Sequence, residues 1–319
     1  MDVVRTPDER FADLPGHPFA PHYRDVVAEG CDPVRMHYLD EGPADGPVAL
    51  LLHGQPTWSY LYRHVVPVLV EAGIRVIAPD NIGFGRSDKP VRPTDYTYQR
   101  HVDWTRSLVT GLDLREVTLL AQDWGGPLGF GVLAAETDRF AAVVAANTIL
   151  HTADPALAGR LGWALHGEGE TRVTIEEGLV DYLLYTQRAE ELRASDFLGA
   201  ATTKPLPPEV LAAYDAPFPT PEHTGGLRQM TALLPLTRND VGARIGRRSW
   251  RALEQFERPF VTAYSDGDPA TRGWAEVFAE RVPGARGQEH VTIAAAGHFL
   301  QEDAGAELGA VVARVVGGC

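Results

Sequence analysis

The chain has little cysteine and no long hydrophobic run.

 

Only two of the 319 residues are cysteine, Cys31 and Cys319, so a disulfide framework and a cysteine metal site are both excluded, and no other segment has the spacing of metal ligands. No segment approaches the ~18 to 20 uninterrupted apolar residues that a membrane span requires, and the first residues lack the apolar stretch of a signal peptide. We therefore expect a cytoplasmic protein that has no metal site and no contact with a membrane.

Basic residues are also in the minority. Lys and Arg number 29 against 43 Asp and Glu, which gives a net charge of −14 at pH 7, and the charges are interspersed along the chain. We therefore expect no nucleic-acid partner. What the chain does have is apolar content, because 44% of its residues are hydrophobic, enough for a sizeable core. The sequence gives no indication of an oligomeric state.

Short β-like runs alternate with helix-length amphipathic segments over most of the chain, the pattern of a mostly parallel sheet flanked by helices. The expected strands are 34–42, 48–54, 75–80, 117–123, 139–150, 259–266 and 290–297. Helices are expected over 58–73 and 96–112, among others. From about 151 the alternation stops, and helical stretches with Pro-rich joins replace it. We therefore predict a first part of an α/β core over 1–150, an inserted helical cap over 151–228, and a second part of the core over 229–319.

The stretch AQDWGGPLG, residues 121–129, lies between a predicted strand and a predicted helix. This is the context of a nucleophile elbow, in which small residues around a tight turn let a reactive side chain stand free above the sheet. The reactive position holds Asp123, where a serine hydrolase has serine. Because an Asp between a strand and a helix can also be a simple N-cap, this stretch alone leaves both interpretations open.

Two distant segments favour the catalytic interpretation. His298 follows a predicted strand near the C-terminus, and Asp266 and Asp268 lie in the loop after the preceding strand. Nucleophile, acid and histidine in this chain order match the triad of the α/β-hydrolases. We favour Asp268 as the acid because the proline after it fixes the loop beyond the strand, whereas Asp266 can be a turn-forming residue.

An aspartate nucleophile has a definite chemical meaning. A serine that attacks an sp³ carbon makes an ether, which activated water cannot hydrolyse, whereas a carboxylate makes an ester that water can open. Asp123 therefore predicts alkyl transfer, with His298 as the general base toward water in the second half-reaction. The backbone N–H groups of Gln55 and Trp124 occupy the two sequence positions that normally form the oxyanion hole.

Five motifs carry a family resemblance that spans nearly the whole chain and weakens across about 155 to 200. They are HGQPTWSYLYR (53–63), VIAPDNIGFGRSDKP (76–90), QDWGG (122–126), YDAPFP (214–219) and AGHFLQE (296–302). Together they resemble the haloalkane dehalogenases, specifically the subfamily with an Asp acid after the strand that precedes the histidine strand. The resemblance implies an α/β-hydrolase fold and the hydrolysis of a small apolar halogenated substrate to alcohol, halide and a proton, without any cofactor.

Carried onto this sequence, the resemblance implies Asp123 as nucleophile, His298 as base and Asp268 as acid. The family's alternative position for the acid, after the strand that ends near 147, holds Asn147. That alternative is therefore unsupported.

The departing halide needs hydrogen-bond donors in a dry pocket. The resemblance implies the indole N–H of Trp124 and a second Trp from the cap. The corresponding cap segment has Tyr182 and Tyr185 but no Trp, and Trp163 lies too early unless the cap has an insertion. Gln55 stands where a sister subfamily has a halide-binding Asn, so its amide is a candidate second donor; alternatively, it only orders the oxyanion loop.

Two other functions stay open. Epoxide hydrolases share the fold and the Asp, His, Asp machinery but bind the epoxide oxygen with cap tyrosines. Tyr182 and Tyr185, three apart on a predicted helix, would lie on one face, unless they only pack that helix. The second alternative is a catalytically inactive α/β-hydrolase that binds a small apolar ligand. Trp124 argues against the epoxide reaction, and the complete triad argues against the inactive protein.

Overall fold

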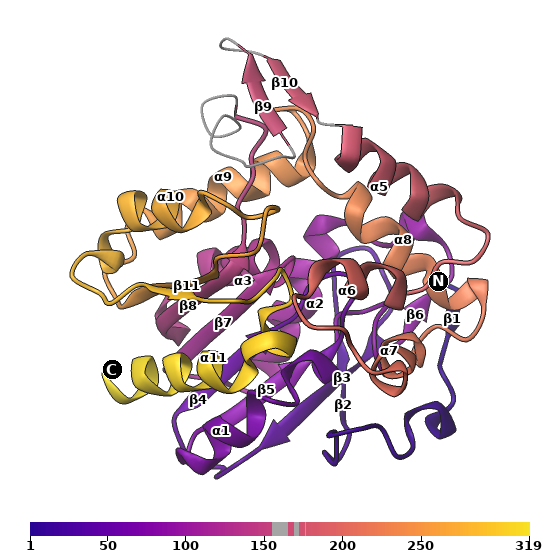
Figure 1. Ribbon diagram of the computed structural model, residues 1–319, viewed down its shortest axis with the longest axis horizontal. Helices are drawn as coiled ribbons and strands as arrows, with labels where there is room; N and C mark the ends of the chain where they lie inside the picture. Colours follow the sequence, from indigo (N-terminus) through magenta and orange to yellow (C-terminus); the bar gives the residue numbers. More distant parts are fainter. Residues whose placement is uncertain (155–164, 169–171, 176) are drawn as a thin grey trace.

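An eight-stranded sheet forms the centre of the computed structural model, which describes residues 1–154, 165–168, 172–175 and 177–319 (Figure 1). Its order is β12-β11-β8-β7-β4-β5-β3-β2. The strands are β2 (His22–Val26), β3 (Val34–Glu41), β4 (Val48–Leu52), β5 (Arg75–Pro79), β7 (Val117–Asp123), β8 (Phe140–Thr148), β11 (Phe260–Ser265) and β12 (Val291–Ile293). Within this sheet, only the β2–β3 and β3–β5 pairs are antiparallel. This is the mostly parallel sheet flanked by helices that the alternating pattern predicted.

Helices cover both faces of the sheet, because the strands carry buried side chains on both of their faces. Alternate residues of β4, such as Leu50 and Leu51, enter two separate cores. One core lies under α1 (Val66–Glu71) and α11 (Leu300–Gly317). The other lies under α2 (Tyr98–Gly111), α3 (Gly125–Ala135), α9 (Val241–Leu253) and α10 (Trp274–Arg281). The central strands are thereby held rigidly from both sides.

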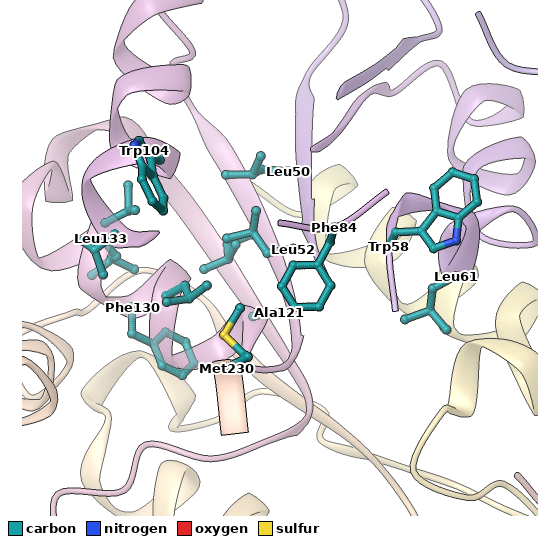
Figure 2. Close-up of a cluster of buried hydrophobic side chains, with 14 of the residues drawn as sticks. Leu50, Leu52, Trp58, Leu61, Phe84, Trp104, Ala121, Phe130, Leu133 and Met230 are labelled. Atoms are coloured by element: carbon teal, nitrogen blue, oxygen red, sulfur yellow. The ribbon is translucent and has the colours of Figure 1, made fainter. Parts of the chain in front are cut away.

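Figure 2 shows part of the second core. Leu52 and Ala121 reach it from neighbouring strands, and Trp104, Phe130 and Leu133 reach it from α2 and α3, all fully or almost fully buried. This packing fixes the C-terminal ends of β4 and β7, where the predicted oxyanion loop and nucleophile lie.

Two local features differ from the sequence expectations. The helix expected over 58–73 is divided into a 3₁₀ turn, Ser59–Tyr62, and α1, because Pro67 is tolerated in the first turn of a helix but not in its interior. β2 was not expected, since only Val26 of this strand is buried and its sequence carries no clear apolar alternation. A further short pair joins β1 (Val3–Val4) to β6 (Lys89–Pro90).

Between β8 and α9, the residues that the structure describes include four helices. They are α5 (Glu177–Arg188), α6 (Ser195–Ala201), α7 (Pro208–Asp215) and α8 (Gly225–Ala232). An antiparallel hairpin of β9 (Leu165–Glu168) and β10 (Arg172–Ile175) precedes them, an element that the expected helical pattern did not include. We call residues 151–228 the cap; its boundaries stay a prediction from the sequence.

No helix among the described residues is long and apolar enough to cross a membrane. Within the same residues, no cluster of three or more His, Cys, Asp or Glu side chains has the arrangement of a metal site.

Candidate active site

Asp123 ends β7 and begins the turn into α3. Its φ of +49° lies in the left-handed region that few residues other than glycine adopt, and the Thr148 hydroxyl donates to its carbonyl oxygen at 2.6 Å. Glycines allow the close approach of the surrounding chain: a Cβ at Gly54 would collide with the Asp123 carboxylate, and one at Gly125 with the Leu52 carbonyl. The elbow therefore requires the small residues that its motif contains.

The two oxygens of the Asp123 carboxylate have different partners. Oδ1 accepts a hydrogen bond from the backbone N–H of Gln55 at 2.7 Å, and Oδ2 lies 3.4 Å from Nε2 of His298. Gly54 also approaches the backbone nitrogen of Trp124, as a Cβ at that position would lie 2.5 Å from it. The two N–H groups expected for the oxyanion hole thus border the same carboxylate.

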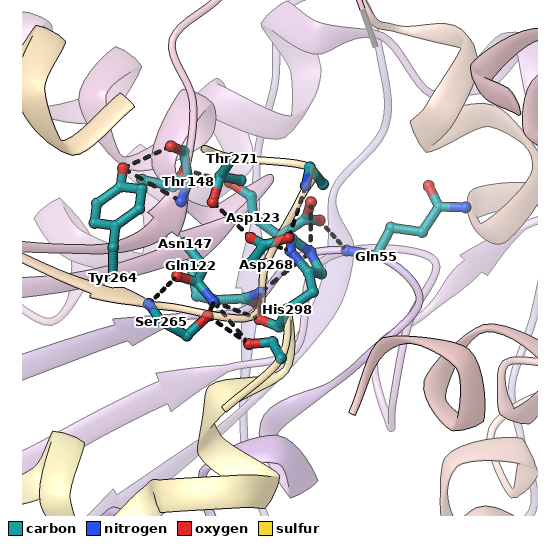
Figure 3. A network of polar contacts seen from close by, with 12 residues as sticks. Gln55, Gln122, Asp123, Asn147, Thr148, Tyr264, Ser265, Asp268, Thr271 and His298 are labelled. Atoms are coloured by element: carbon teal, nitrogen blue, oxygen red, sulfur yellow. Dashed lines mark hydrogen bonds and ion pairs between the residues drawn. The ribbon is translucent and has the colours of Figure 1, made fainter. Parts of the chain in front are cut away.

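His298 lies in the loop after β12, and its ring connects two carboxylates (Figure 3). Its Nδ1 is 2.9 Å from Oδ2 of Asp268, which also accepts a hydrogen bond from the Thr271 hydroxyl at 2.5 Å. Oδ1 of Asp268 accepts one from the Ala270 N–H at 2.9 Å. The Asp268 side chain is 1% exposed, whereas Asp266 lies on the surface. The geometry supports Asp268, rather than Asp266, as the acid.

The charges around His298 set its protonation. Burial disfavours the imidazolium, but the charges of Asp268 and Asp123 and their hydrogen bonds outweigh burial and raise the pKa of His298 to about 10. Burial would by itself raise the pKa of Asp268, but His298 and the hydrogen bonds to the carboxylate lower it below its ordinary value. Asp268 and Asp123 therefore favour the imidazolium form of His298 in the free site.

Two amide side chains that the sequence analysis did not assign to the site support the histidine loop. Gln122 Nε2 donates to the carbonyl of His298 at 3.1 Å. Asn147 Nδ2 donates to the carbonyls of Gly297 at 2.9 Å and His298 at 3.1 Å, and its Oδ1 accepts from the Ser265 N–H at 2.9 Å (Figure 3). Asn147 thus holds the backbone of the loop from the position that the family resemblance gave as the alternative place for the acid. The only feature of the sequence that pointed to Asn147 was its position near the end of a predicted strand.

A cavity of about 470 Å³ opens above Asp123, Trp124 and His298. Much of its wall is apolar, including Pro127, Ile149, Phe197, Leu234 and Phe299. The Trp124 ring forms one side and packs edge-on against Tyr98, with 5.6 Å between the ring centroids. A cavity of this kind suits a small, largely apolar molecule.

The remaining candidate residues, Gln55, Tyr182 and Tyr185, differ in where their polar groups lie. Gln55 Nε2 donates to the Leu227 carbonyl of α8 at 2.7 Å, and Figure 3 shows this side chain directed away from Asp123. Tyr182 lines the cavity, and burial raises the pKa of its hydroxyl. Tyr185 is 40% exposed and donates to Asp196 at 2.7 Å, so the hydroxyls of the two tyrosines do not converge on Asp123. Trp163 lies outside the described residues.

Comparison with known proteins gives consistent matches. The family model described as alpha/beta hydrolase fold matches residues 47–305. A haloalkane dehalogenase of Psychrobacter cryohalolentis is 43% identical over 99% of this chain and 98% of its own length. One from Mycobacterium marinum is 45% identical over 97% of each chain.

Solved structures agree with the sequence matches. The tetrameric haloalkane dehalogenase DpaA from Paraglaciecola agarilytica superposes with a TM-score of 0.83 at 32% identity, covering 98% of this chain and 97% of its own. These matches extend over the core and the cap together. The chain therefore belongs to the haloalkane dehalogenases, hydrolases of the α/β-hydrolase fold that act on carbon–halide bonds.

Proposed function

We propose that this chain hydrolyses small haloalkanes through a covalent ester on Asp123. The observation that carries the proposal is the line of side chains Asp123, His298 and Asp268, which lies beneath a largely apolar cavity. An apolar cavity accommodates an alkyl chain, and a carboxylate at its base can attack the halogen-bearing carbon.

In the first step, an oxygen of Asp123 attacks that carbon from the side opposite the halogen. The new C–O bond forms as the C–X bond breaks, and the halide leaves with the bonding electron pair. The indole N–H of Trp124 would donate a hydrogen bond to the halide, because its ring lines the cavity directly after the nucleophile. Donors placed there stabilise the charge that develops on the leaving halogen.

In the second step, water attacks the carbonyl carbon of the Asp123 ester while His298 accepts its proton. Esterification removes the charge of Asp123, which is one of the two carboxylate charges that favour the imidazolium. The imidazolium can then lose its proton to solvent, and the neutral imidazole, oriented by Asp268, acts as the base. The N–H groups of Gln55 and Trp124 would stabilise the oxyanion before the alcohol leaves and the carboxylate is restored.

Tyr182 is the second halide donor that the geometry supports best. Its side chain lines the same cavity as Asp123 and Trp124. Gln55 already donates one amide hydrogen to Leu227. We therefore assign Gln55 to ordering the oxyanion loop, with halide binding as the alternative.

Epoxide hydrolysis is the second candidate, because Tyr182 brings one cap hydroxyl to the cavity. The reaction as epoxide hydrolases perform it uses a pair of tyrosines, and the Tyr185 hydroxyl is bound to Asp196 instead. The dehalogenase reaction needs no such pair, so it fits the site better.

Halide release from terminal bromo- and chloroalkanes, measured by ion chromatography, tests the proposal. We expect release with the unmodified protein and none beyond background with Asp123→Asn, which keeps the shape of the side chain but lacks the nucleophilic charge. Epoxides are assayed in parallel. Epoxide opening without halide release from the folded protein would contradict the proposal and favour the second candidate.

A further inference from the structure

Asp303 lies in the first turn of α11 and binds two segments that are far apart in the sequence. Its carboxylate accepts the N–H of Gly297 at 2.8 Å, directly before His298. It also accepts the N–H groups of Thr203, at 3.0 and 3.2 Å to the two oxygens, and Lys204 at 3.1 Å. One buried carboxylate therefore joins the histidine loop to the cap.

The surrounding contacts make this junction continuous. The Thr203 hydroxyl donates to the Ala295 carbonyl at 2.7 Å, and the N–H of Phe299 donates to the Ala201 carbonyl at 3.3 Å. A Cβ at Gly297 would lie 2.5 Å from the same Ala201 oxygen, so the two segments run in close contact. The cap segment 201–203 and the histidine loop 297–299 both contribute to the cavity wall. In Figure 1, α6 lies beside the start of α11, where these segments meet.

The shape of α11 keeps its first turn separate from the rest of the helix. Ala304, the next residue after Asp303, has φ −146° and ψ 38°, which interrupts the helix. Leu300 to Asp303 therefore form a short turn of their own, which a kink at Ala304 separates from the long segment that packs on the sheet.

We propose that Asp303 is a positioning residue for the general base, and that through it the cap contacts control the opening of the Asp123 ester. The inference rests on the proposed function. Formation of the ester needs the carboxylate of Asp123, which Gln55 holds from the other side. Opening of the ester needs the ring of His298 in place, and a displacement of about 1 Å in a catalytic group can cost about 100-fold in rate.

The loop has other supports, so the effect of losing Asp303 is limited. Asn147 and Gln122 hold the carbonyl of His298, and Asp268 holds its ring. The loop is therefore displaced rather than released when its bond at Gly297 is lost. We expect ester opening to slow about tenfold and ester formation to change less than about threefold.

Asp303→Asn is the variant that tests this. Both carboxylate oxygens accept N–H groups, and an amide offers one oxygen and one NH₂, so at least one N–H then faces a donor. Rapid-quench measurement of halide in the first turnover reports ester formation, and the steady-state rate reports the slower ester opening. Mass spectrometry detects the alkylated Asp123 peptide. The expected result is a burst of halide near one equivalent and an accumulated ester.

Glu302→Gln is the matched control. Glu302 precedes Asp303, is also buried, and contacts Arg63 and Tyr214 of the cap rather than the histidine loop. It should lose stability without accumulating ester. Thr203→Val, which removes the bond to Ala295, is a milder change on the cap side and should slow ester opening in the same direction.

Different results overturn different statements. If the unmodified protein releases no halide and forms no ester, the proposed function fails. If it turns over but folded Asp303→Asn shows no burst, with both steps unchanged or slowed equally, only the role of Asp303 is wrong. Should Asp303→Asn not fold, Thr203→Val decides: unchanged ester opening in that variant contradicts the inference.

Discussion

At the scale of single residues, Asp123 combines a strained backbone with a specific chemical role. Its left-handed φ directs the carboxylate out of the sheet edge toward His298 and the Gln55 N–H. A serine in the same turn could not form an ester with an alkyl group. In the proposed reaction, the identity of this one side chain therefore selects displacement at a saturated carbon.

The pKa of His298 is the residue-scale quantity that this arrangement predicts. In Asp123→Asn, one of the two charges that raise the pKa is gone, so we expect the pKa of His298 to fall from its raised value. An NMR titration of the ¹⁵N-labelled imidazole in both proteins measures it. An unchanged pKa would show that Asp268 alone sets the protonation of His298.

The same shift has a consequence for stability. Because the folded pKa of His298 lies above its unfolded value, the stabilisation is fully present below the unfolded pKa of about 6.5 and is lost as pH rises through the folded pKa. Asp123→Asn lowers the folded pKa of His298, and with it the pH at which this stabilisation is lost. Urea unfolding between pH 6 and 10 should therefore show a smaller loss of stability with rising pH in the variant.

At the scale of secondary-structure elements, α5 directs its two tyrosines differently. Both rings contact Phe197, with centroids 5.0 Å from it for Tyr182 and 5.6 Å for Tyr185. The spacing of three residues thus places both on one side of the helix. Their hydroxyls nevertheless differ, because Tyr185 reaches Asp196 at the surface. A shared helix face does not give a shared binding site.

We predict that Tyr182→Phe weakens halide binding about tenfold, because the charged product loses one hydrogen bond. Gln55→Ala should leave the affinity within about twofold. The inhibition constant of bromide in steady-state turnover measures both. The reverse result, with the larger loss in Gln55→Ala, would assign the second halide donor to Gln55.

At the scale of the whole molecule, buried polar contacts join the cap to the core. Glu302 of α11 binds the guanidinium of Arg63, with Nη2 at 2.6 Å from Oε2, and also contacts the hydroxyl of Tyr214 in α7. The Trp58 indole donates to the Ala213 carbonyl of the same helix at 3.2 Å. These contacts predict that α7 unfolds together with the core.

Glu302→Gln tests this coupling. The change leaves the Arg63 charge buried without its carboxylate, so we expect the free energy of unfolding to fall by about 3 kcal/mol. Denaturant unfolding followed by tryptophan fluorescence and by far-UV circular dichroism should shift together. Separate transitions from the two signals would show that the cap and the core unfold independently.

Much of the fold and the centre of the candidate site could be predicted from the sequence. Apolar runs at strand length, separated by helical periodicity, are local patterns, and they specified the order of the strands along the chain. The elbow around Asp123 was visible because its glycines and its reactive residue are consecutive. The position of His298 followed from the chain order of the family's triad.

The remaining features depend on contacts between distant segments. Burial distinguishes Asp268 from Asp266, although both are acidic residues of the same loop. Asn147 and Asp303 reach the histidine loop by side-chain bonds to backbone atoms, which leave no motif because any residue can supply a backbone N–H or carbonyl. The sequence by itself thus determined the fold and the candidate reactive residues, through local periodicity and motif order. Only the tertiary structure decided which polar groups hold them, because those bonds form only when strands and helices pack together.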